Sequence, residues 1–250
     1  MSAISVSEQQ GVRYLHFGSA LVQGAMRIAR PYGLELEYTR DMMLPLMLRG
    51  SARWPASVLQ IGLGSASITK FLHKHRPETR LVVVELREDV LAVSRQYFKL
   101  PDESPMLRIE IADGFDYLAR QRKPFDWIIV DGFDGDGHAG ALDSAPFYHN
   151  ARAHLTANGM ISVNLVGPRL KQKTARERIA HAFENRMITT EREGDANLIL
   201  VAALGEPIEV RMLKLRTAGA ALQKETGVDF GATVERALGK RATSGEPLKL

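Results

Sequence analysis

Four aspartates fall within residues 131–143, where the sequence reads DGFDGDGHAGALD. Four glycines are interleaved with them, so the backbone of this stretch can adopt the turns of a loop that closes on a ligand. Grouped carboxylates can hold the ammonium groups of an amine and accept the proton that a reacting amine loses. The spacing differs from that of a calcium loop, which ends in a glutamate, and we expect no bound metal. The stretch therefore favours chemistry on a cationic amine.

Three further sites follow three predicted strands. Gly62-Leu63-Gly64-Ser65 leads from a buried strand into a helix, and glycine there lets the backbone approach a ligand. Glu85 closes the next strand, where a carboxylate can accept both hydroxyls of a ribose. Asp113 can accept the exocyclic amine of adenine, and Gly114 lets the ring lie flat. Because ligands bind at the carboxyl ends of strands in open α/β sheets, the three sites predict one adenosyl pocket.

The elements that must position these residues alternate between strand and helix. Strands are expected at 58–62, 80–85, 107–111, 126–130 and 160–165, and helices at 67–75, 87–98, 115–120, 147–155 and 169–184. Two more strands, 187–191 and 197–203, are joined by a turn too short for a crossover, so they must form an antiparallel hairpin. This pattern predicts an α/β fold with a doubly wound, seven-stranded, mostly parallel sheet that ends in the hairpin. That layout is Rossmann-like and typical of methyltransferase-like domains.

The two ends of the chain show different patterns. The first 50 residues predict a small β segment with strands at 3–6, 11–17, 25–28 and 34–38, then a short helix over 41–48 broken at Pro45. The helix at 147–155 is expected to stop before Asn158-Gly159. The last residues predict helices at 210–226 and 229–239 and a polar tail. We expect a β segment over 1–50, an adenosyl-binding Rossmann-like domain over 51–205 and a helical extension over 206–250.

The amino-acid composition excludes several kinds of chemistry and of partner. The 250 residues contain no cysteine, which excludes disulfides, thiolate nucleophiles and cysteine-ligated metals. No apolar run is long enough to span a membrane, and the first residues lack the features of a signal peptide, so we expect a cytoplasmic protein. The net charge of +4 is small, and aromatic residues are not interleaved with the basic ones. We therefore expect no nucleic-acid partner and no membrane partner.

Taken in order, these stretches resemble the spermidine synthase (polyamine aminopropyltransferase) family over about residues 3–203. The resemblance rests on the β-rich start with Gln23, the segment LELEYTRDMMLPLML, the GLGSAS turn, VVVELREDVLAVSRQYF, IADGFDYL, the DGFD loop and the APFY stretch. Such a protein transfers an aminopropyl group from decarboxylated S-adenosylmethionine to an amine. S-adenosylmethionine or its decarboxylated form is then a co-substrate, no cofactor is permanently bound, and a homodimer or homotetramer built through the N-terminal β segment is expected.

The resemblance also assigns roles to residues. It implies that Gln23 contacts the adenosyl ligand, together with the glycine turn (Gly62, Gly64 and Ser65), that Glu85 binds ribose, and that Asp113 with Gly114 binds adenine. Asp131 is the acid that takes the amine proton, and Asp134 helps to hold the far amine. Tyr38 and Tyr148 line the polyamine channel. The family has an aspartate where this sequence has Ser65, and an acid where it has Arg40.

Those two differences keep other functions open. A serine at 65 and an arginine at 40 would accommodate the carboxylate of S-adenosylmethionine itself, which favours a methyltransferase on the same fold. A protein that binds an adenosyl ligand without catalysis is a third hypothesis. The first hypothesis, aminopropyl transfer to an amine, is the one that the acidic loop supports, and the two lost acids make putrescine a doubtful acceptor.

Overall fold

The computed structural model describes residues 3–18, 22–51, 53–133, 138–191 and 196–250. Its centre is a seven-stranded sheet in the order β6-β5-β4-β7-β8-β10-β9. Strands β4 to β8 run parallel to one another, whereas β10 is antiparallel to both β8 and β9. The predicted sheet and its antiparallel hairpin are thus confirmed. The strands are β4 (Ser57–Ile61), β5 (Arg80–Glu85), β6 (Leu107–Ile111), β7 (Phe125–Val130), β8 (Leu155–Val166), β9 (Met187–Thr190) and β10 (Asn197–Ala203).

Helices cover both faces of this sheet, which explains why its central strands are almost continuously apolar. One hydrophobic core lies between the sheet and α1 (Glu37–Met42), α2 (Leu44–Arg49), α3 (Ser67–His75), α4 (Glu88–Tyr97), α8 (Met212–Thr226) and α9 (Gly231–Leu238). The other lies under α5 (Gly114–Ala119), α6 (Ala145–Ala153) and α7 (Arg169–Ala182). A 3₁₀ turn, Gly140–Asp143, leads into α6.

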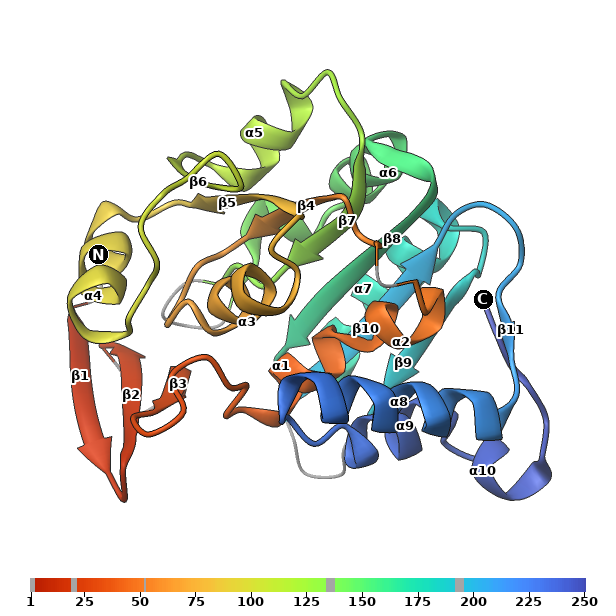
Figure 1. Ribbon diagram of the computed structural model, residues 1–250. Helices are drawn as coiled ribbons and strands as arrows, with labels where there is room; N and C mark the ends of the chain where they lie inside the picture. The colour runs from red at the N-terminus through yellow and green to blue at the C-terminus, as the bar shows by residue number, and fades with distance from the viewer. Residues whose placement is uncertain (1–2, 19–21, 52, 134–137, 192–195) are drawn as a thin grey trace.

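A small antiparallel sheet precedes the large one, as expected for the N-terminal β segment. It contains β1 (Ile4–Gln9), β2 (Val12–Phe17) and β3 (Val22–Arg27), and Figure 1 shows it beside α4 and below the edge of the large sheet. Contacts run from β1 to α4 and from β3 to α3. The small sheet therefore reaches the start of α3, where the glycine turn lies.

Three local predictions are wrong. Residues 34–38 form no strand, because α1 begins at Glu37 and its packing against the sheet overrides the β propensity of the segment. Pro45 lies in the first turn of α2, which begins at Leu44, and its missing N–H costs nothing there, so it stands at the start of a second helix instead of breaking one. Asn158-Gly159 lies within β8, since the helix before it already ends at Ala153.

The C-terminal end is not a polar tail. After α10 (Arg241–Ser244), β12 (Leu248–Lys249) pairs with β11 (Glu209–Val210), and the side chains of Leu248 and Leu250 are buried. Helix α8 packs on α2, and α9 packs on α1 and β9. Among the described residues, no helix is long and apolar enough to cross a membrane.

Candidate functional site

The strand order of the sheet reverses between β4 and β7, which pair with each other. In open α/β sheets, ligands bind in the crevice at the carboxyl ends of the strands next to such a reversal. Gly62 follows β4 with a φ of +94°, and a Cβ atom there would lie 2.2 Å from the carbonyl oxygen of Asp131. The backbone N–H of Asp131 donates to the carbonyl of Ile61 at 2.8 Å. Only glycine at 62 lets the two chain segments meet this closely, so the glycine turn and Asp131 share one site.

Two side chains hold the carboxyl group of Asp131. The hydroxyl of Tyr38 donates to Oδ2 at 3.1 Å, and the amide of Asn164 donates to Oδ1 at 2.8 Å. Burial raises the pKa of Asp131, while the bonds from Asn164 and Tyr38 act in the opposite direction. Burial and the neighbouring Asp131 charge raise the pKa of Tyr38 well above its usual value, so its hydroxyl keeps the proton that it donates. The result is a fixed carboxylate of increased basicity at the sheet edge.

Asn164 was missed by the sequence reasoning. It lies in β8 and is buried, and its side-chain oxygen has no hydrogen-bond partner among the described residues. A buried polar atom of this kind normally has a partner. The signal was present, since an asparagine interrupts the apolar run MISVNLV, but the sequence could not show that it faces Asp131. The free oxygen can accept a hydrogen bond from an amine that lies against Asp131.

Tyr38 reaches Asp131 because α1 is fixed from the other end of the chain. Arg236 of α9 donates from Nε to Oδ2 of Asp41 at 2.8 Å and from a terminal nitrogen to Oδ1 at 2.7 Å. The hydroxyl of Thr233 adds a bond to Oδ1 at 2.6 Å, and Arg236 also reaches Glu37. Asp41 is buried, and the side chain of Arg236 exposes only 14% of its surface. The C-terminal residues thus hold the helix that carries Tyr38.

Glu85 ends β5 and ties the glycine turn to this strand. Its carboxylate accepts the backbone N–H of Leu63 at 2.9 Å and that of Arg87 at 3.0 Å. Burial raises the pKa of Glu85, and these backbone N–H groups oppose the rise. A carboxylate has about four acceptor positions, so Glu85 can still accept a hydrogen bond from a ribose hydroxyl.

Asp113 and Gly114 lie at the start of α5. One oxygen of Asp113 caps the helix by accepting the N–H of Phe115 at 2.8 Å and that of Asp116 at 3.1 Å. Its second oxygen belongs to an exposed side chain and can face a ligand. Gly114 is buried, and a Cβ atom there would lie 2.4 Å from Cγ2 of Ile61. Packing alone therefore demands glycine at 114, whether or not adenine lies nearby.

Gln23, Gly64 and Ser65 meet where β3 approaches the turn. A Cβ atom on Gly64 would lie 3.4 Å from the carbonyl oxygen of Gln23. Ser65 is buried against Gly24, and its hydroxyl is 3.0 Å from that of Ser67. Ser65, which stands where the resembling family has an aspartate, therefore packs against the small sheet. The turn itself is held by a residue that the sequence reasoning missed, Gln60, whose amide donates to the carbonyl of Gly62 at 2.7 Å.

The remaining predicted residues lie apart from this group or outside the described residues. Tyr148 is fully buried, and its hydroxyl donates to Asp143 at 3.1 Å, so the structure does not bring it to Asp131. Asp143 also pairs with Arg178 at 2.9 Å. Asp134 lies outside the described residues. Within the described part of the chain, no three acidic or histidine side chains gather as metal ligands.

Comparison with known proteins identifies the family of this chain. Residues 36–188 match the family model described as the spermine/spermidine synthase domain. The polyamine aminopropyltransferase of Neisseria meningitidis serogroup A is 33% identical over 227 residues, which cover 91% of this chain and 86% of that protein.

Two solved structures share the fold. A probable spermidine synthase from Corynebacterium glutamicum has a TM-score of 0.73 at 20% identity and covers 90% of this chain and 83% of its own. Human methyltransferase-like protein 13 in complex with SAH has a TM-score of 0.67 at 25% identity, and the match covers 77% of this chain and 93% of that chain. At 20% identity, the likeness to the Corynebacterium structure shows a shared fold and no more. The family model and the Neisseria relative together span most of the chain, and the protein belongs to the spermine/spermidine synthase family.

Proposed function

We propose that this protein is an aminopropyltransferase that moves the aminopropyl group of decarboxylated S-adenosylmethionine to an amine. One observation carries the proposal: Tyr38 and Asn164 orient the carboxyl group of Asp131 beside the glycine turn, at the crevice of the sheet. The relatives that are named polyamine aminopropyltransferases support the reaction class.

The residues divide between the two substrates. Glu85 binds the ribose of the donor, Asp113 with Gly114 binds adenine, and Gln23 with the turn residues Gly62, Gly64 and Ser65 borders the methionine-derived part. The acceptor amine lies against Asp131, between Tyr38 and the free oxygen of Asn164. We keep Asp134 and Tyr148 as expected contacts of the far end of the acceptor.

The reaction is a displacement at carbon. The neutral amine nitrogen attacks the aminopropyl carbon next to the sulfonium, a C–N bond forms, and the C–S bond breaks with its electron pair going to sulfur. The leaving group is the thioether methylthioadenosine, and the proton of the amine passes to Asp131. A base whose pKa is raised by burial takes this proton more readily, because proton transfer is most effective when the pKa of the base is near the working pH. Alignment of nitrogen, carbon and sulfur supplies the rest of the acceleration.

The test compares Asp131→Asn and Asp131→Ala with Asp116→Asn, which changes an exposed carboxylate on α5. Release of methylthioadenosine is measured with decarboxylated donor and a panel of diamines that includes putrescine. Loss of a general base should lower turnover about 10²- to 10⁴-fold in both Asp131 variants. Donor affinity, measured by calorimetry, should stay within a few-fold of wild type. Normal turnover in Asp131→Ala would refute the assignment.

A methyltransferase is the second candidate, favoured by Ser65 and by the structural likeness to human methyltransferase-like protein 13. Arg40 supports methyl transfer less than we expected from the sequence. Its guanidinium donates to the backbone carbonyls of Leu34 at 2.9 Å and Glu35 at 3.2 Å, which reduces its capacity to bind the carboxylate of a donor. Calorimetry with S-adenosylmethionine and its decarboxylated form separates the candidates. A strong preference for the carboxylated form would favour methyl transfer, and binding without turnover of either donor would favour a non-catalytic adenosyl-binding protein.

We further propose a cytoplasmic homodimer or homotetramer. Val22 and Ile28, at the open edge of the small sheet, expose 42% and 43% of their surface. An apolar strand edge of this kind suits pairing with a second copy. Light scattering of the purified chain would measure its mass, and a monomer at micromolar concentration would contradict the proposal.

A further inference from the structure

A hollow lies at the amino-terminal ends of the parallel strands, at the opposite end of β7 from Asp131. It has a volume of about 450 Å³ and is formed by the amino-terminal parts of β5, β6 and β7 with the loop that follows α5. Helix α5 and strand β5 have six residues each, and a helix rises only about 1.5 Å per residue against about 3.3 Å for a strand. The short helix therefore leaves the starts of the strands uncovered on this face.

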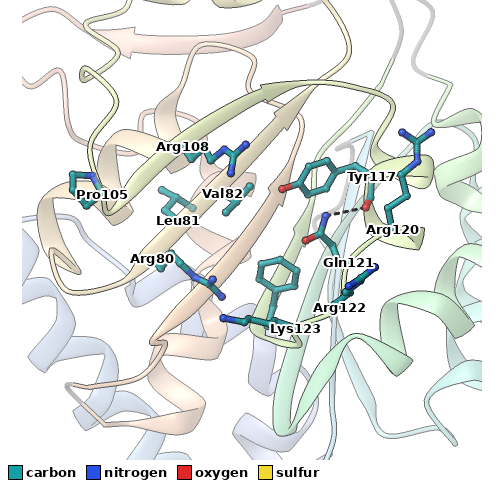
Figure 2. Close-up of a pocket in the computed structure, with 11 residues that line it drawn as sticks. Arg80, Leu81, Val82, Pro105, Arg108, Tyr117, Arg120, Gln121, Arg122 and Lys123 are labelled. Atoms are coloured by element: carbon teal, nitrogen blue, oxygen red, sulfur yellow. Dashed lines mark hydrogen bonds between the residues drawn. The ribbon is translucent and has the colours of Figure 1, made fainter.

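The lining of this hollow is strongly cationic. Of its eleven residues, five are arginine or lysine and none is acidic: Arg80, Arg108, Arg120, Arg122 and Lys123. Arg80 and Arg108 share the face of Val82, because side chains alternate along β5 and Val82 is paired with Arg108 across the parallel strands. Figure 2 shows the charged ends of Arg80 and Lys123 directed toward each other and Arg108 directed into the same space, whereas Arg120 extends away.

Three of these cations have no ion-pair partner among the residues that the structure describes. Arg108 pairs with Glu110, and Arg120 pairs with Asp116 at 3.8 Å. For Arg80, Arg122 and Lys123, the described part of the chain supplies no ion pair. Like charges that face each other repel, and a bound anion would remove this repulsion.

The uncharged part of the lining suits a flat aromatic ring. Tyr117 stands at one side with its hydroxyl directed inward, as Figure 2 shows, and the buried residues Val82 and Phe125 complete the apolar part of the lining. The side chain of Gln121 also faces the hollow beside Tyr117 and offers both a donor and an acceptor. Burial and the charge of Glu110 raise the pKa of Tyr117, whereas the charges of Arg108 and Arg80 act to lower it, so both cations and the carboxylate paired with Arg108 act on the ring. A volume of about 450 Å³ is within the range of small-molecule sites.

We propose that this hollow binds a phosphate-bearing small molecule of the nucleotide class, with its phosphates between Arg80, Arg108 and Lys123 and its base against Tyr117. The site is separate from the donor pocket, because the lining residues begin the strands whose carboxyl ends carry Glu85 and Asp131. A ligand bound here leaves the crevice free for the transfer reaction.

The test is calorimetric titration of the whole chain with ATP, inorganic tripolyphosphate and adenosine. The pocket variant Arg80→Glu/Lys123→Glu is compared with Lys214→Glu/Lys224→Glu, which makes the same change in net charge on the exposed side of α8. We expect one ATP per chain, bound more tightly than tripolyphosphate, and weaker binding at higher salt. The pocket variant should lose about tenfold or more in ATP affinity, since two charge-assisted contacts are reversed, and the α8 variant should bind as wild type does.

Two further arms identify the site. Asp113→Ala should still bind ATP, and the pocket variant should release methylthioadenosine at the wild-type rate. Equal loss of ATP in the pocket and α8 variants, or wild-type binding in the pocket variant, overturns the proposal. So does loss of ATP in Asp113→Ala, which would place the nucleotide in the donor pocket. Equal affinity for tripolyphosphate and ATP refutes a contact with the base, and competition by duplex DNA at equal phosphate concentration would indicate a surface for nucleic acid instead.

Discussion

Removal of either hydrogen bond to Asp131 should change both the rate and the pH dependence of transfer. Tyr38→Phe deletes the donor to Oδ2, and Asn164→Leu deletes the donor to Oδ1. Both donors stabilise the ionised carboxylate, so the pKa of Asp131 must rise when either is lost. The acidic limb of the kcat/KM profile, which reports the base of the free enzyme, should therefore move to higher pH in both variants.

The size of the effect follows from the chemistry of these bonds. A hydrogen bond to a charged group contributes about 1.5–3 kcal/mol, which corresponds to about ten- to a hundredfold in kcat/KM if the carboxylate loses its orientation. Because the two bonds act on one carboxylate, the double variant should lose less than the product of the single losses.

The assay is methylthioadenosine release between pH 5 and 9, about the range in which an amine and a carboxylate of raised pKa change protonation. Tyr97→Phe, on α4 and half exposed, is the matched control. An acidic limb that stays in place or moves to lower pH in Tyr38→Phe would refute the reasoning. So would an equal loss of rate in Tyr97→Phe.

Three further predictions concern the elements around the site. Arg236→Ala leaves the buried carboxylate of Asp41 without its cation and should cost about 3–5 kcal/mol in denaturant unfolding, whereas Arg216→Ala, which breaks an exposed pair with Glu235, should change the stability little; equal losses would show that the α9–α1 contact is unimportant. Asp113→Ala removes the cap of α5, which should lower stability by about 0.5–2 kcal/mol, and it should also weaken donor binding. Asp113→Asn should keep both the cap and the donor affinity, and thermal melts and calorimetry measure the two effects. An unchanged donor affinity in Asp113→Ala would show that adenine does not bind at this position. Lys70 is buried, and burial lowers its pKa from 10.5 to about 7, so the unfolded chain binds more protons between these values and wild-type stability should rise with pH in that window. The stabilising effect of Lys70→Met should accordingly be larger at pH 6 than at pH 10 in thermal melts, and a difference independent of pH would contradict a buried neutral amine.

The acid beside the glycine turn could be assigned from sequence because parallel strands bring their carboxyl ends to one edge. Glu85, Asp113 and Asp131 lie at the carboxyl ends of three strands that the apolar runs identify. Their placement at one side of the sheet could therefore be predicted from the sequence. The hairpin at the end of the sheet was equally determined, since the turn between its strands is too short for a crossover. These are consequences of local pattern and chain length.

Tyr38 shows where local pattern fails. Its segment has the composition of a strand but forms a helix, because Asp41 is bound by Arg236 and Thr233 from nearly 200 residues further along the chain. The same holds for Asn164, which a sequence shows only as a polar residue in a buried strand.

The sequence by itself therefore determined the alternation of strands and helices, the order of the sheet's main connections and the edge at which carboxylates gather. Tertiary structure alone decided which side chains touch Asp131, which way Ser65 and Arg40 turn, and that Arg80, Arg108 and Lys123 surround one hollow. The physical reason is the range of the interactions. Hydrophobic periodicity and turn length act between neighbours in the chain, whereas hydrogen bonds to a buried carboxylate and the repulsion of unpaired cations join residues that only the packed fold brings together.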